Sequence, residues 1–115
     1  MSYALHKLAD LPEEKLGNGL IFRKFVNGEK LTFAHFTAKK GAQAAIHSHE
    51  NEQVTCVLKG AIKINIDGKE VILRADDILV IPSNTPHSAT VLEDIVLIEV
   101  FSPVRQDWLP KSTKE

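Results

Sequence analysis

The sequence predicts a single-domain, all-β protein built as a small barrel or sandwich. Three observations predict this fold class: apolar and polar residues alternate in short runs, the runs recur at short spacing, and turn residues separate them. The 115 residues suffice to bury one core. We therefore expect one domain over residues 1–115, with the barrel core at about 20–109. Only residues 8–16 look helical, and Pro12 interrupts them.

The first expected strands cover residues 30–38 and 53–59, where side chains alternate in character. A hairpin is expected next, at residues 61–73. The pair Asp67-Gly68 stands there between two alternating runs, which is the strongest short-range signal for a tight two-residue turn.

Three further strands are expected at residues 78–82, 87–91 and 95–101. The last of them is apolar on both faces, apart from Glu99, and two-sided apolarity indicates burial on both sides. One face of a small barrel would normally meet solvent. We therefore expect a homodimer, in which a second copy of the chain covers the outer face. The alternative is that the N-terminal segment folds over it.

Composition excludes several classes of function. The net charge is −1 and no block of Lys and Arg stands out, so no nucleic-acid partner is expected. No stretch approaches the roughly 20 apolar residues of a membrane helix. The first 15 residues carry charges where a secretory leader would be apolar, so a cytoplasmic protein is expected. Cys56 is the only cysteine, which leaves no intrachain disulfide, and we expect it to be a small core residue.

The stretch HSHENEQ at residues 47–53 predicts a metal site. His47, His49 and Gln53 are all odd-numbered, so on an extended strand they would project to the same side. Gln53 keeps this parity if the strand resumes in phase after a bend. His87, at the start of a later strand, is the expected fourth ligand.

A pair of histidines separated by one residue is a weak signal, since a histidine in a turn is often only a solvated side chain. The joint pattern is stronger, because Gly41 and Gly60 frame the first segment and Pro82 and Pro86 precede the second. Four neutral ligands leave a divalent ion its full charge and an open coordination position, which suits Lewis-acid chemistry better than redox chemistry. Zinc, nickel, manganese and iron are all compatible with such ligands.

Glu99 is the strongest candidate for a catalytic group. It interrupts a run of Ile, Leu, Val and Phe, and it shares a side with Phe101. A carboxylate that faces a barrel interior is costly unless it is paired or functional, and burial raises its pKa toward the range of a general acid or base. The alternative is a salt bridge with Arg105 or Arg23. Arg105 could also clamp a substrate carboxylate in bidentate fashion.

Other polar residues are expected to have lesser roles. His35 is expected to be a core or rim residue instead of a ligand. Glu50 and Glu52 flank the ligands, and we expect them to face solvent or to orient a ligand histidine. Asp76 and Asn84 stand at turns where a positive φ is expected.

The two histidine segments resemble the paired motifs of the cupin superfamily, a jelly-roll β-barrel, over residues 20–109. Gln53 stands where the usual first motif has Glu. Asp76 and Asn84 stand where the second motif usually has Gly. The resemblance implies a single-domain cupin barrel.

The combination of HSHENEQ with LIEVFSPVRQDWL resembles the pectin-degradation cupins of the KdgF type. This resemblance implies three histidines and a glutamine as ligands of one divalent metal. It also implies a small anionic sugar as substrate: a 4,5-unsaturated monouronate from pectin or alginate digestion, converted to its linear keto form. The family has a catalytic aspartate two residues before the Phe, and Glu99 occupies that position with one more methylene. Phe101 and Arg105 match the family pattern.

Three other functions remain open at this point. Cyclase-type cupins that act on polyketides use similar ligands, although one Trp and one Tyr offer little stacking surface for a large aromatic substrate. An iron-dependent dioxygenase is less compatible with Gln53 than with Glu. The chain could also bind a sugar or metabolite without turnover.

Overall fold

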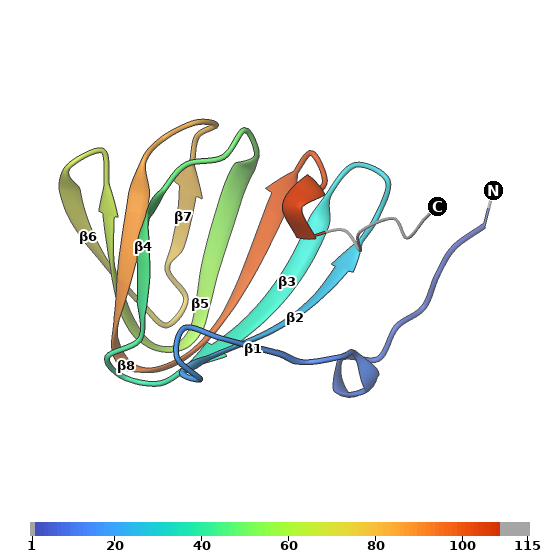
Figure 1. Cartoon of the computed structure of the whole chain (residues 1–115), viewed down its shortest axis with the longest axis horizontal. Coiled ribbons are helices and arrows are strands. Elements are labelled where there is room, and N and C mark those ends of the chain that lie inside the picture. Colours follow the sequence, from blue (N-terminus) through green and yellow to red (C-terminus); the bar gives the residue numbers. More distant parts are fainter. Residues whose placement is uncertain (1, 109–115) are drawn as a thin grey trace.

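The computed structural model describes residues 2–108 and consists almost entirely of β-strands (Figure 1). In chain order the strands are β1 (Glu14–Leu16), β2 (Ile21–Asn27), β3 (Thr32–Ala38), β4 (Gln43–His47), β5 (Glu52–Ile66), β6 (Lys69–Arg74), β7 (Ile78–Ile81) and β8 (His87–Ser102). The helical elements of this range are two three-residue turns, η1 (Leu8–Asp10) and η2 (Gln106–Trp108), and neither is long enough to cross a membrane. The all-β prediction is confirmed, whereas the predicted end of the barrel core at Leu109 lies outside the described residues.

Strands β5 and β8 are long and belong to both layers of the barrel. All pairings are antiparallel. One layer runs in the order β1-β2-β3-β8-β5-β7, and the other in the order β4-β8-β5-β6. Figure 1 shows β4 and β6 on one side of these two strands and β2 and β3 on the other. A strand shared in this way must bend sharply between the layers.

Gly60 lies at the bend of β5. The pairing of β5 with β8 shifts register on both sides of it, between Val57 and Ile62. Its φ is +91°, and a Cβ at this position would lie 2.2 Å from the carbonyl oxygen of Asp94. Only glycine fits such a backbone conformation at such a close approach.

The predicted turns are confirmed. β5 and β6 form a hairpin through Asp67 and Gly68, whose φ values of 49° and 84° match the two positive angles of a type I′ turn. Asp76 and Asn84 also have positive φ, at 73° and 61°. Asn and Asp tolerate this conformation better than most residues, which explains how the chain dispenses with glycine there.

In the second half of β8, at residues 95–101, the odd-numbered side chains face the interior, as parity predicted. Leu97 and Phe101 are at most 5% exposed. On the outer face, Ile98 is half-buried. Tyr3 and Leu5 of the N-terminal segment do not cover this face, since they are 93% and 84% exposed. The segment contacts the face at its edge, where Lys24 of β2 donates to the carbonyl oxygens of Leu8 and Ala9. Figure 1 shows that segment running away from the barrel.

Candidate functional site

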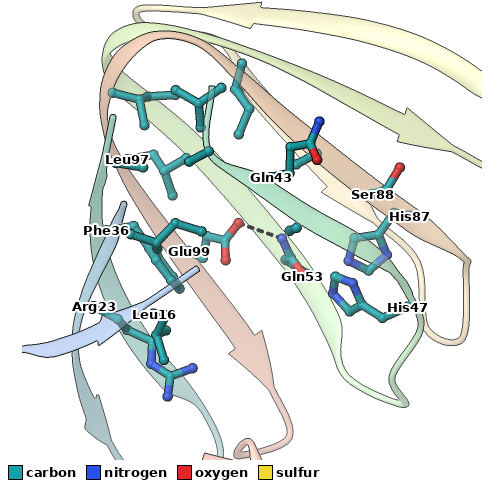
Figure 2. A pocket seen from close by; sticks show the side chains of 18 of the residues that line it. Leu16, Arg23, Phe36, Gln43, His47, Gln53, His87, Ser88, Leu97 and Glu99 are labelled. Carbon is teal, nitrogen blue, oxygen red and sulfur yellow. Dashed lines mark hydrogen bonds between the residues drawn. The ribbon is translucent and has the colours of Figure 1, made fainter. Parts of the chain in front are cut away.

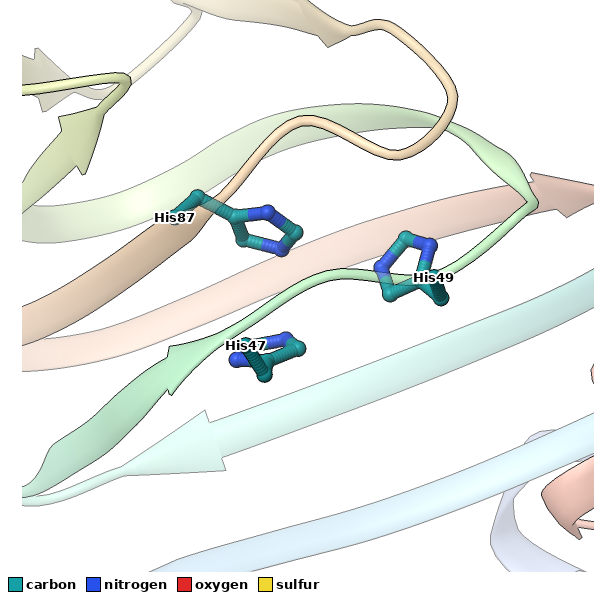
Figure 3. A group of neighbouring side chains, drawn as sticks. All are labelled: His47, His49 and His87. Carbon is teal, nitrogen blue, oxygen red and sulfur yellow. The ribbon is translucent and has the colours of Figure 1, made fainter.

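Three histidines meet at one end of the barrel (Figure 3). The pairing of β4 with β8 sets His47 directly opposite His87, and their ring centroids are 4.3 Å apart. His49 lies two residues beyond the end of β4, in the loop before β5. One ring nitrogen from each histidine lies within 4.8 Å of the other two, so the group is positioned to bind a metal ion.

Each imidazole is oriented by a backbone carbonyl. The Nδ1 atoms of the three histidines lie 2.8, 3.0 and 2.8 Å from the carbonyl oxygens of Ala45, Asn51 and Thr85, respectively. A carbonyl oxygen only accepts hydrogen bonds, so each Nδ1 carries a proton and donates. A neutral ring then presents the lone pair of Nε2 to a metal. Glu50 and Glu52, the predicted candidates for orienting the rings, are exposed.

Gln53 presents an oxygen to the same site. Its Nε2 donates to Thr55 Oγ1 at 2.9 Å and to Glu99 Oε2 at 2.8 Å, which fixes the amide and leaves Oε1 3.1 Å from His49 Nε2. Since His49 donates through Nδ1, these two facing atoms are both acceptors. Two acceptors this close are stabilised by a shared cation. Adjacent ligands of an ion with bonds of about 2.1 Å would stand about 3 Å apart, so this donor set fits a metal.

The surroundings favour the neutral form of His49 and His87. Burial, followed by the nearby charge of Arg105, holds the pKa of His49 below its ordinary value of 6.5. Burial also lowers the pKa of His87. A lowered pKa keeps these two imidazoles unprotonated near neutral pH, and only unprotonated imidazole binds a metal.

Glu99 reaches the site from β8. The residue as a whole is half-buried, but its carboxyl group is enclosed by protein, and this burial raises its pKa to about 7. Thr55 Oγ1 donates to Oε2 at 3.0 Å, and that hydrogen bond and the charge of Arg105 only partly oppose the effect of burial. Oε2 accepts from both Gln53 and Thr55, so a proton on this carboxyl would sit on Oε1.

Arg105 lies beside the site but is already paired. Its Nε and Nη2 donate to the two carboxylate oxygens of Asp107 at 2.9 and 2.6 Å. The guanidinium lies 4.7 Å from the ring centroid of Phe101 and 4.3 Å from that of Trp108. Within the described residues no ion pair joins Glu99 to Arg105 or Arg23, so the predicted structural alternative for Glu99 is not observed.

Two buried polar residues hold the segment that carries Arg105. Asn51 lies in the loop that carries His49, between β4 and β5. It donates through Nδ2 to the carbonyl oxygens of Pro103 and Val104. Thr32 Oγ1 accepts a hydrogen bond of 2.9 Å from the backbone nitrogen of Arg105. These hydrogen bonds connect the loop after β8 both to the β4–β5 loop and to β3.

These residues line a cavity of about 300 Å³, at the small end of the range for ligand pockets. Figure 2 shows Glu99 and Gln53 between His47 and His87 on one side and Phe36 and Arg23 on the other. The inner wall is apolar and includes Ile62, Val91, Ile95 and Leu97. The histidines, Gln53 and Glu99 therefore line a small cavity whose inner wall is apolar.

The seven predicted site residues come together around this cavity. His49 reaches it beside Phe101, whose ring lies edge-on to the imidazole with centroids 5.6 Å apart.

The prediction for Cys56 is wrong: it is half-buried on the outer face of β5, not in the core. Sequence reasoning assigned no role to Thr55, although it shares the parity of Gln53 on the same strand. It also missed Asp107, for which no pattern gave a signal.

Comparisons with known proteins agree with this architecture. A family profile described as "Cupin domain" matches residues 34–101. The pectin degradation protein KdgF of Dickeya dadantii (strain 3937) is 34% identical over 105 residues, covering 87% of this chain and 93% of that protein.

Two solved structures are similar over nearly the whole chain. KdgF from Halomonas sp. has a TM-score of 0.86 and 29% identity, covering 94% of this chain and 100% of that one. An RmlC-like cupin from Shewanella frigidimarina NCIMB 400 has a TM-score of 0.85 and 28% identity, covering 94% and 97%. With the profile match and the KdgF relative, the β-barrel and the histidine cluster at its mouth identify this chain as a member of the cupin family.

Proposed function

We propose that this protein is a metal-dependent enzyme that converts 4,5-unsaturated monouronates to linear keto-uronates by hydration and ring opening. One observation carries the proposal: Gln53 links the three-histidine site to the carboxyl of Glu99, whose pKa burial raises to about 7. A metal-binding group and a proton donor thus face the same small cavity. The relationship to KdgF, named for pectin degradation, supports an acidic sugar as substrate.

The reaction requires a proton at C4 and water at C5 of the unsaturated ring. The resulting hemiketal then opens by cleavage of its ring C–O bond. His47, His49, Gln53 and His87 would hold one divalent metal ion, which supplies Lewis-acid polarisation of the bound uronate oxygens. Because all four ligands are neutral, the full dipositive charge acts on the anionic substrate.

Glu99 would donate the proton to C4. Its Oε2 accepts hydrogen bonds from Gln53 and Thr55, so Oε1 carries the acidic proton toward the cavity. A carboxyl with a pKa of about 7 is half protonated near neutral pH, which suits a group that must give up a proton and recover it in each turnover.

Phe101 and Arg105 would complete the substrate site. The ring of Phe101 is 1% exposed and stands between His49 and Trp108, where it can wall one face of the sugar. Arg105 keeps Nη1 outside its pair with Asp107, and its charge would offset that of the substrate.

The test is to incubate metal-loaded protein with unsaturated galacturonate and with unsaturated mannuronate, and to follow the loss of conjugated-alkene absorbance. We expect rapid loss with the metal-loaded protein and none above the buffer rate with the metal-free protein. His87→Ala should behave like the metal-free protein, and His6→Ala, a change in the exposed N-terminal segment, should behave like wild type. No turnover of either sugar by metal-loaded wild type would contradict the proposal.

The alternatives give different readouts. A dioxygenase would consume oxygen with its substrate. A binding protein would bind the saturated sugar and release the unsaturated one unchanged. A polyketide cyclase requires a larger site than the cavity of about 300 Å³, so this alternative is the least compatible with the structure.

A further inference from the structure

Arg23 is a cavity residue to which the chemistry above assigns no role. It lies on β2, directly opposite Glu14 of β1, and its side chain is 13% exposed. Figure 2 shows it beside Leu16, on the far side of Glu99 from His47. It lines the same cavity as the metal-binding histidines, so a ligand held there can reach both.

Among residues 2–108, most hydrogen-bond donors of Arg23 have no partner. Its Nε donates to Glu14 Oε1 at 2.7 Å, and within residues 2–108 this is the one hydrogen bond that its guanidinium makes. Both terminal nitrogens therefore remain available. Arg105 differs, because the edge formed by its Nε and Nη2 is occupied by Asp107. Of the two arginines, Arg23 keeps the larger share of donors for a ligand.

Trp108 brings the two arginines to one end of the cavity. The guanidinium carbons of Arg23 and Arg105 lie 3.9 and 4.3 Å from its ring centroid. Phe25 also lies under Arg23, at 5.4 Å. Stacking on aromatic faces holds a guanidinium plane in a fixed orientation.

Two cations that share one aromatic neighbour and line one cavity favour an anion within reach of both. Glu14 offsets part of the charge of Arg23, but its side chain is 44% exposed, and an exposed ion pair is weak. A planar carboxylate matches the two terminal nitrogens of a fixed guanidinium in bidentate geometry.

We infer that Arg23 binds the carboxylate of the ligand together with Arg105, and that it determines the preference of this site for an acidic over a neutral sugar. The identification of the ligand as a uronate rests on the proposed function. The competing explanation is purely structural: Arg23 would only tie β1 to β2 through Glu14.

Binding of saturated sugars tests this inference without any turnover. Isothermal titration of zinc-loaded protein with D-galacturonate and with D-galactose measures the preference for the acid. Arg23→Gln should weaken galacturonate binding by about ten- to a hundredfold, the effect of losing charge-assisted hydrogen bonds, and leave galactose binding unchanged. Arg23→Lys keeps the charge without the two-donor edge and should recover part of the affinity.

Glu14→Gln is the matched control. It removes the same ion pair as Arg23→Gln but leaves the guanidinium in place, so galacturonate should bind at least as tightly as to wild type. A purely structural role predicts instead that Glu14→Gln and Arg23→Gln have similar effects on both sugars. If Arg23→Gln does not fold, Arg23→Lys decides, and wild-type affinity for galacturonate in that variant overturns the inference.

The inference and the proposed function can fail separately. Loss of acid preference in Arg23→Gln, with no turnover of unsaturated uronates by wild type, would keep the role of Arg23 and remove the reaction. Turnover by wild type, with an unchanged KM and unchanged galacturonate affinity in Arg23→Gln, would keep the reaction and overturn the role of Arg23. Equal binding of both sugars by wild type, or binding of neither, also overturns it.

Discussion

Gln53 donates a hydrogen bond of 2.8 Å to Glu99, while its own oxygen lies 3.1 Å from His49 Nε2. One amide therefore joins the histidine cluster to the carboxyl group of Glu99. An amide is suited to this position because it offers an acceptor on one side and donors on the other. A carboxylate would offer acceptors on both sides and would face Glu99 with a like charge.

Gln53→Glu tests this link. The new carboxylate would add a charged metal ligand but repel Glu99, raising the Glu99 pKa further and halving the formal charge of the metal site. We expect metal binding to be kept and kcat at pH 7 to fall at least about tenfold. The alkaline limb of the pH–rate profile should move to higher pH, because the acid stays protonated to a higher pH. Glu52→Gln, at the exposed neighbouring position, should change none of these. Full activity with an unshifted profile in Gln53→Glu would show that the link is not used.

Glu99→Gln tests the proton donor itself. The amide oxygen can still accept from Gln53 and Thr55, so we expect folding and metal content to be kept. It has no acidic proton, so kcat should fall about 10²- to 10⁴-fold. Glu99→Asp retains the acid but retracts it by one methylene, and it should retain measurable activity. Wild-type ring opening by Glu99→Gln would rule out the acid–base role.

Side-chain parity predicted much of this site because the two-residue period of a strand is a backbone property. Glu99 and Phe101 on β8, and Gln53 on β5, face the cavity as their odd numbers required. Parity gives a common face but not which face is inside. Cys56, which has the opposite parity to Gln53, was expected in the core, whereas its strand turns it outward.

The remaining features depend on loops and on contacts between distant segments. Two of the carbonyl oxygens that orient the histidines, those of Asn51 and Thr85, belong to connections between strands, whose conformations no periodic pattern encodes. The third, that of Ala45, lies where the pairing of β4 with β8 is irregular. The bidentate pair of Arg105 with Asp107 forms on the turn η2, which sequence alone did not predict. The stacking of Arg23 on Trp108 joins the first part of the chain to the last.

The Arg105–Asp107 pair predicts a pH-dependent contribution to stability. The hydrogen bonds and charge of Arg105 hold the pKa of the Asp107 carboxyl below its ordinary value of 3.8. A lowered folded-state pKa contributes stability above the unfolded-state value, and this contribution is lost as the pH falls through the folded-state value. Asp107→Asn should therefore be less stable than wild type at pH 7 and equally stable in strong acid.

The difference should be modest, at most about 1 kcal/mol, because the side chain of Asp107 is 61% exposed and solvent screens the pair. Urea unfolding of both proteins from pH 7 to pH 2 measures it. Asp10→Asn, on the exposed turn η1, is the control and should show no such convergence. A gap between wild type and Asp107→Asn that persists unchanged at pH 2 would contradict the electrostatic explanation.

The outer face of the layer β1-β2-β3-β8-β5-β7 predicts a homodimer. Five apolar side chains form one row across β2, β3, β8, β5 and β7, in register from strand to strand: Val26, Phe33, Val100, Val54 and Val80. Ile98 and Ile78 lie in the next row. With strands about 4.8 Å apart, the row extends over about 19 Å. An apolar area of this extent indicates an interface, and the same face of a second copy is its natural partner through a two-fold axis.

Val80→Lys tests the dimer with little risk to the fold, since Val80 is 53% exposed in the single chain. Val80 stands at the end of this row, on β7, so a lysine there would be desolvated against the apolar side chains of the second copy without a partner of opposite charge. We expect wild type to sediment as a dimer and Val80→Lys as a monomer with an unchanged Tm of the fold. Ile72→Lys, at a 49% exposed apolar position on β6, should remain dimeric. A wild-type protein that sediments as a monomer at about 100 μM would contradict the prediction. The inference that a second copy of the chain covers the outer apolar face of β8 would then be wrong.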